Sequence, residues 1–232
     1  MISLANRLEG IIKLHRGEDL VEKLFLFVKD NVNYKFGDWT LEPQKVLRVR
    51  NGMCTTKSRL LHKLLSDNGF ETYYKILRIN ARRIFGRFTI TEIANYLSEN
   101  SVHFFVVVKY NSTTTELDCS IDRDLEKKIK LFGYEYDHNW SMPNDYINFI
   151  DKKYLIDESG LVKNIDSYTS RKISYKNRLK FFISNVCLDY IRNCNPEDFH
   201  GGRISKEIFF SWLKKKNFFY YLIFLVLVYL KK

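Results

Sequence analysis

The spacing of apolar residues predicts helices and strands over most of the chain. Apolar residues recur at helical spacing within residues 4–32 and again over Thr55–Asn68, where a leucine-rich stripe is closed by Gly69. Residues 71–80 alternate as in a half-buried strand, and His103–Tyr110 is an apolar, β-branched run typical of a buried strand. Helices around a few neighbouring strands predict an α+β fold with an antiparallel sheet.

Further elements are expected after these strands. In chain order they are a helix over 89–99, a strand over 115–121, a helix over 122–132, an irregular region over 133–170 and a helix over 177–192. The dipeptides Asn195-Pro196 and Gly201-Gly202 then mark a boundary. We therefore predict one domain over 1–195, with a core at about 20–125 and a helical or irregular part over 126–195, followed by a linker over 196–216 and a tail over 217–232.

The tail is a continuous apolar stretch, Phe218–Leu230, with lysines at 214–216 before it and at 231–232 after it. As a helix it would measure about 20 Å, which is less than the roughly 30 Å of a bilayer's hydrocarbon core. Two interpretations stay open. The tail is either a membrane segment whose flanking lysines reach the bilayer surface, or a terminal helix or strand docked on the protein body.

Composition narrows the class of protein. Of the 232 residues, 45% are hydrophobic, which fits a packed core, and the formal net charge is +11. Such a charge attracts nucleic acid, anionic lipid or acidic protein. The basic residues are scattered and no nucleic-acid-binding motif occurs, so a solvated basic surface is the simplest interpretation and nucleic acid is the weaker expectation. An anionic membrane could contact residues 214–232.

The four cysteines are Cys54, Cys119, Cys187 and Cys194. None stands in a Cys-x-x-Cys pair, and no His/Cys cluster has zinc spacing, so we expect neither a metal nor another cofactor. The first residues lack the pattern of a signal peptide. Reduced thiols in a cytoplasmic protein are therefore expected.

Cys54 has the features of a nucleophile. It follows a bend at Gly52 and opens a predicted helix. Unpaired N–H groups and the positive end of the helix dipole at that position favour a thiolate. The alternative is a small buried hydrophobic residue.

His103 and Asp118 could complete a catalytic set with Cys54. Opposed residues of a hairpin have a constant sum of residue numbers, which is 223 for a two-residue turn at Asn111-Ser112 and 225 for a four-residue turn over 111–114. His103 and Asp118 sum to 221, which is also odd, so any even-length turn puts both on one face, opposite or diagonal. Asp118 would then orient the imidazole, with Asp122 of the same parity as a reserve candidate.

The chain resembles the transglutaminase-like superfamily, which has a papain-like layout. The segments that carry the resemblance are Val46–Ser58 around the cysteine, the leucine pairs at 60–61 and 64–65, Asn68–Thr72, His103, and Leu117-Asp118. It covers about residues 20–125. It implies a cysteine nucleophile at a helix N-terminus, with a histidine and an aspartate from neighbouring strands.

The resemblance implies acyl transfer on amide bonds through a thioester at Cys54, with His103 moving the proton and Asp118 orienting it. The acceptor would be water in a protease or amidase and an amine in a transglutaminase; a protein or peptide is the implied substrate. The Cys54 N–H is one candidate oxyanion donor, and the Gln44 side-chain amide is a second. The alternative is a non-catalytic transglutaminase-like module that binds protein, nucleic acid or a membrane surface.

Overall fold

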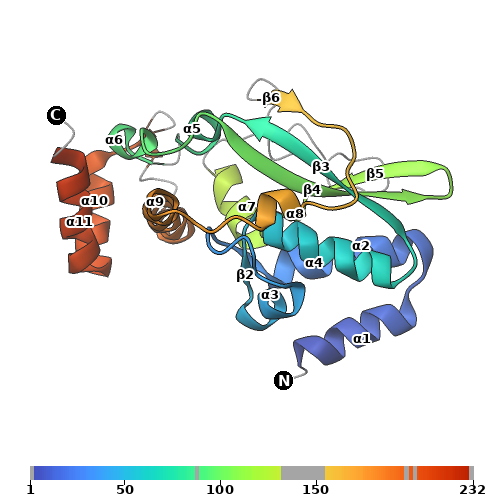
Figure 1. Cartoon of the computed structure of the whole chain (residues 1–232). Coiled ribbons are helices and arrows are strands. Elements are labelled where there is room, and N and C mark those ends of the chain that lie inside the picture. The colour runs from blue at the N-terminus through green and yellow to red at the C-terminus, as the bar shows by residue number, and fades with distance from the viewer. Residues whose placement is uncertain (1–2, 87–88, 132–154, 196–198, 201–202, 230–232) are drawn as a thin grey trace.

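A mixed α+β fold is formed by the residues that the computed structural model describes, which are 3–86, 89–131, 155–195, 199–200 and 203–229 (Figure 1). Its main sheet has the order β5-β4-β3-β6, and every neighbouring pair is antiparallel. The strands are β3 (Glu71–Ile79), β4 (Ser101–Tyr110), β5 (Thr113–Leu117) and β6 (Leu155–Glu158). The predicted α+β class with an antiparallel sheet is confirmed at this level.

The hairpin of β4 and β5 has a two-residue turn, the shorter of the two turns that the sequence leaves open, so β5 begins two residues before the predicted start at 115. Tyr110 pairs with Thr113, and Asn111 and Ser112 both have positive φ, as this kind of turn requires. The β5 strand ends at Leu117, which is earlier than predicted. The chain turns there because the Ser120 N–H donates to the carboxylate of Asp118, the residue that follows Leu117, at 2.9 Å.

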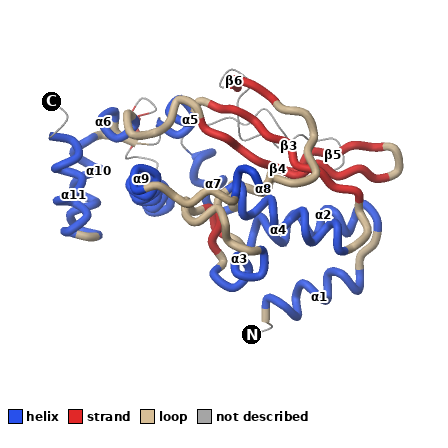
Figure 2. Tube along the Cα trace, in the orientation of Figure 1, coloured by secondary structure: helices blue, strands red, loops and turns tan. Residues whose placement is uncertain are grey.

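Two helices lie on one side of the sheet (Figure 2), and their apolar residues share one core cluster with residues of β4 and β5. They are α2 (Gly17–Asn31) and α4 (Cys54–Asp67), and α1 (Leu4–Leu14) packs on α2. The single helix predicted over 4–32 is wrong. It is interrupted before Gly17, whose φ of +57° ends a continuous helix and whose Cα lies close against the ring of Tyr110.

Short elements connect the larger ones: β1 (Asn33–Tyr34), α3 (Pro43–Val49), β2 (Asn51–Gly52), α5 (Ala81–Phe85), α6 (Thr91–Ala94), α7 (Arg123–Leu131) and α8 (Asp166–Thr169). The helix predicted over 89–99 is reduced to α6. Ile90 and Ile93 are the buried anchors of this region, and the N–H groups of Tyr96 and Leu97 then donate three residues back, which tightens the chain into turns. Of the predicted irregular region over 133–170, residues 133–154 lie outside the described residues.

The C-terminal part consists of α9 (Tyr175–Asn193), β7 (Phe199–His200), β8 (Arg203–Ile204), α10 (Lys206–Lys216) and α11 (Phe218–Tyr229). The linker predicted over 196–216 is wrong at 206–216, because α10 buries Phe209, Phe210 and Leu213 in one cluster with α9. The tail forms α11, which packs beside α10 (Figure 1). None of the helices in the described ranges is long and apolar enough to cross a membrane.

Candidate active site

Cys54 is the first residue of α4, and close packing fixes the turn that carries it. The N–H of Met53 donates to the Thr56 hydroxyl at 3.0 Å, which ties the entry to the first helical turn. A Cβ on Gly52 would lie 2.7 Å from that same hydroxyl oxygen. Position 52 therefore needs glycine, and the thiol is held at the helix N-terminus where unpaired N–H groups favour a negative charge.

His103 and Asp118 lie on the same face of the hairpin, in the diagonal relation that the parity of their numbers predicts. The imidazole Nε2 lies 2.7 Å from Oδ2 of Asp118, and both residues are 6% exposed. Asp118 is itself held by the backbone of Ser120. The structure thus brings together the two residues in a dry, hydrogen-bonded pair that fixes the imidazole orientation.

The Cys54 thiol is hydrogen-bonded to the imidazole of His103. Because Nε2 faces Asp118, Nδ1 is the nitrogen that can face the sulfur. Burial is the largest influence on the pKa of Cys54 and raises it, but the bond and charge of His103, the Phe104 N–H and the Thr55 hydroxyl together hold that pKa below its ordinary value. All three candidate residues are therefore assembled within one buried cluster.

The charges of this cluster reinforce one another. Burial lowers the pKa of His103. The charge and hydrogen bond of Asp118, followed by those of Cys54, outweigh burial and raise that pKa to about 10. Burial raises the pKa of Asp118, but the positive charge and hydrogen bond of His103 outweigh burial and lower that pKa below its ordinary value. This arrangement therefore shifts Cys54 and Asp118 toward their deprotonated forms and His103 toward its protonated form.

The other thiols differ in their surroundings. All four cysteines are free and buried. Burial raises the pKa of Cys119 and of Cys187 to about 12 in each case, because no histidine offsets the loss of water there. Cys54 is thus set apart from these two by its partners and not by its exposure.

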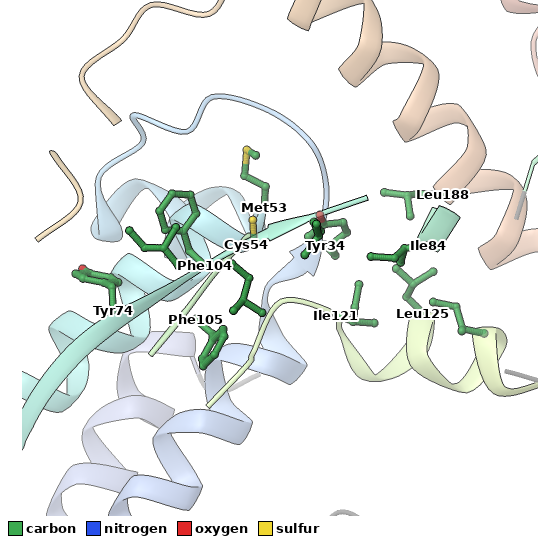
Figure 3. Packing of buried hydrophobic residues seen from close by; sticks show 14 of the residues in the cluster. Tyr34, Met53, Cys54, Tyr74, Ile84, Phe104, Phe105, Ile121, Leu125 and Leu188 are labelled. Atoms are coloured by element: carbon green, nitrogen blue, oxygen red, sulfur yellow. The ribbon is translucent and has the colours of Figure 1, made fainter. Parts of the chain in front are cut away.

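A cavity of about 430 Å³ opens onto Cys54 and His103. Aromatic side chains form part of its walls, and Figure 3 shows Cys54 among Met53, Tyr34 and Phe104. Phe36 stacks on Phe181 of α9 with ring centroids 5.7 Å apart, which closes one side. A cavity of this size, with the Cys54 thiol in its wall, can receive a side chain or a short peptide-like segment.

Two contributors to the site have no distinctive sequence signal. The Phe104 backbone N–H bonds to the Cys54 sulfur, and only the register of β4 could place it there. Tyr34 lines the cavity; burial first, and then the negative charge of Cys54, raises the pKa of its hydroxyl well above the ordinary value. Tyr34 is therefore a protonated donor beside the thiolate.

Two residues named from the sequence lie elsewhere. Asp122, the reserve candidate, accepts from the Tyr34 N–H and from Arg192, both at 2.6 Å, and caps α7 through the Leu125 N–H. Its carboxylate links β1, α7 and α9 and does not face His103. Gln44 is exposed on α3 and is not part of the cavity wall. It lies two residues before Val46, the buried position of α3, and so points to a different side of the helix.

Lys57 is a buried cation one turn after the nucleophile. Its ammonium donates to the Val32 carbonyl at 2.5 Å, at the C-terminal end of α2, where the helix dipole favours a positive charge. Burial lowers the pKa of Lys57 to about 8, although the negative charges of Cys119 and Asp122 partly offset it. Through this hydrogen bond, Lys57 links the end of α2 to the first turns of α4, next to the site.

Within the described ranges, no three His, Cys, Asp or Glu side chains gather as a metal site. No protein-family model matches the chain, and no curated protein matches it.

Proposed function

We propose that this protein is a cysteine-nucleophile enzyme of transglutaminase-like fold that transfers acyl groups from amides through a thioester. The observation that supports this most is the connected row of Cys54, His103 and Asp118 at the wall of a cavity, with the His103–Asp118 bond at 2.7 Å. An inert structural cysteine needs neither a buried imidazole nor a buried carboxylate behind it.

The reaction follows from the positions of these groups. The Cys54 thiolate attacks the amide carbonyl carbon, and the oxyanion forms beside the helix N-terminus, where the Cys54 N–H has no carbonyl partner within the helix. His103 gives its Nδ1 proton to the leaving amine as the C–N bond breaks, which leaves a thioester. Water or an amine then transfers a proton to His103 and attacks the thioester, which releases the acyl product and restores the thiolate.

The thiol itself provides the first test. Limiting iodoacetamide is applied to the native protein from about pH 5 to pH 9, and the labelled cysteines are mapped by mass spectrometry. We expect selective labelling of Cys54 below pH 7, and loss of that selectivity in His103→Ala. Equal and slow labelling of all four cysteines would contradict the proposal and favour a binding module.

A matched pair of variants tests turnover. Cys54→Ala should abolish hydrolysis or transfer on a screened amide substrate while circular dichroism and the unfolding midpoint stay unchanged. Cys187→Ala is the control, because Cys187 is equally buried but bonds to Thr89 outside the site. Full activity in Cys54→Ala would refute the mechanism.

A further inference from the structure

The described wall of the cavity beside Cys54 contains cationic side chains and no carboxylate. Arg171 and Lys172, in the connection between α8 and α9, and Lys180 of α9 belong to its described wall, which contains no aspartate or glutamate. Arg171 and Lys172 are exposed, and within the described part of the chain neither pairs with a carboxylate. The wall therefore presents positive charge to whatever occupies the cavity.

These cations are fixed next to an aromatic lining. The Trp39 indole N–H donates to the Arg171 carbonyl at 2.7 Å, and the Trp39 ring lies against Phe181 with centroids 5.8 Å apart. Tyr168 of α8 contacts Phe104, whose backbone N–H bonds to the nucleophile, with ring centroids 5.4 Å apart. The basic connection is thereby held to both the apolar lining and the β4 segment that carries His103.

From this juxtaposition we infer that the acyl donor is a peptide-like molecule that combines an apolar or aromatic side chain with a carboxylate. The apolar part would fill the aromatic lining, and the carboxylate would bind at Arg171 and Lys172. Arginine and lysine bind carboxylates through charge-assisted hydrogen bonds. This inference rests on the proposed function, because it assigns a substrate class to the same nucleophile.

Chloroacetyl dipeptide amides that alkylate Cys54 provide the test. In wild-type protein, chloroacetyl-Phe-Asp-amide should label Cys54 about tenfold faster than chloroacetyl-Phe-Asn-amide at low ionic strength, and added salt should reduce the difference. A third probe, chloroacetyl-Phe-Gly with a free C-terminal carboxylate, shows whether a terminal carboxylate speeds labelling of Cys54 as the Asp side chain does.

The variant R171E/K172E should abolish or reverse the preference for the Asp probe. The double variant K176E/R178E is the matched control, because Lys176 and Arg178 are exposed nearby at the start of α9 and do not line the cavity. Equal labelling by the Asp and Asn probes with Cys54 still the reactive thiol would overturn the substrate class alone. Absence of selective Cys54 labelling by every reagent would overturn the proposed function as well.

A second, independent observation concerns α11. Its sequence has no charged residue, and only Phe224 and Val228 are buried. Along one side the helix exposes Phe219, Leu222, Val226 and Tyr229, at intervals of three and four residues, with exposed fractions of 67%, 43%, 52% and 57%. These four residues, which we call the α11 face, form a continuous apolar stripe at one end of the molecule (Figure 1).

Charge next to this stripe indicates what could cover it. Lys214, Lys215 and Lys216 are exposed and directly precede α11. An apolar helix side bordered by lysines suits the surface of an anionic bilayer, where apolar side chains enter the acyl boundary and lysines contact the headgroups. Since α11 is too short to cross a bilayer, we propose that the α11 face lies on an anionic membrane surface.

Sedimentation of the full chain with vesicles tests this proposal. Vesicles containing phosphatidylserine should bind the protein at least about tenfold better than pure phosphatidylcholine vesicles, and the difference should fall with salt. The variant L222E/V226E should lose binding, whereas Leu14→Glu, a change at an exposed leucine of α1, should retain it. Absence of vesicle binding, or a dimer in light scattering that L222E/V226E dissociates, would overturn the proposal.

Discussion

At the scale of single residues, the bond between His103 and Asp118 determines both the orientation and the charge of the imidazole. Replacement of Asp118 by asparagine keeps the shape and removes the charge that raises the pKa of His103. We expect turnover to fall by about 10³- to 10⁴-fold, as in other triads. The alkaline limb of the pH profile, near pH 10 in the wild type, should move to lower pH because the imidazolium loses its stabilising partner.

The pH dependence of kcat/KM measures this effect, and Asp122→Asn is its control. Asp122 is an equally buried aspartate four residues later that joins β1 to Arg192 of α9. Its replacement should lower the unfolding midpoint and leave the pH profile in place. If Asp118→Asn kept the wild-type profile, His103 would not depend on Asp118 as the structure implies.

Tyr34 is the second residue whose role the site predicts. Its protonated hydroxyl lies in the cavity beside Cys54, so it can donate to negative charge that develops on the sulfur or on the substrate oxygen. We expect Tyr34→Phe to lower kcat by about 100- to 1000-fold, the range found for loss of one such donor, with a smaller change in KM. Tyr74→Phe removes a hydroxyl from another buried tyrosine, one that stacks on His62, and serves as the control. Equal kcat values in the two variants would exclude this role for Tyr34.

At the scale of elements, Lys57 connects the start of α4 to the end of α2. Burial lowers its pKa from 10.5 to about 8. Between these values the unfolded chain binds more protons than the folded one, so this lysine makes stability rise as pH increases. Over the full window the gain is about 3 kcal/mol.

The prediction is best measured as a difference between the wild type and Lys57→Met. His103 acts in the opposite direction, because its raised pKa stabilises the fold below about pH 6.5 and that stability is lost as pH rises through about 10. This contribution is present in both proteins and cancels in the difference. The free energy of unfolding of the wild type relative to the variant should therefore increase from pH 8 to pH 10.5. A constant difference would mean that Lys57 titrates normally.

Elements with short-range signals could be predicted from the sequence. The leucine stripe and Gly69 predicted α4 within one residue at each end, and the parity of their residue numbers put His103 and Asp118 on one face for any even-length turn. Contacts made by backbone groups and distant side chains have no such signal. The position of Tyr34 depends on its N–H bond to Asp122, 88 residues away, and the Phe104 N–H acts only once β4 is folded beside α4.

At the scale of the whole molecule, the C-terminal helices are part of the folded body. Helix α9 ends at Asn193, shortly before the predicted boundary at Asn195-Pro196, but α10 and α11 return to the same apolar cluster. Tyr190 of α9 contacts Phe209 and Trp212 of α10 with ring centroids 5.2 and 5.1 Å apart. A local pattern of glycine and proline marks a turn and contains no information about this long-range packing.

Phe224 tests whether α11 stabilises the fold or only rests on it. Its side chain is fully buried and lies 5.8 Å from the Phe209 ring and 6.0 Å from the Phe182 ring, between centroids. Phe224→Ala should lower the free energy of unfolding by about 3–5 kcal/mol, the usual cost of such a cavity. Phe219→Ala, on the exposed α11 face, should change it by less than about 0.5 kcal/mol. Chemical denaturation of both variants decides the question. Equal small losses of unfolding free energy would mean that α11 is only loosely attached to the body. Equal large losses would mean that the exposed side of α11 is also packed.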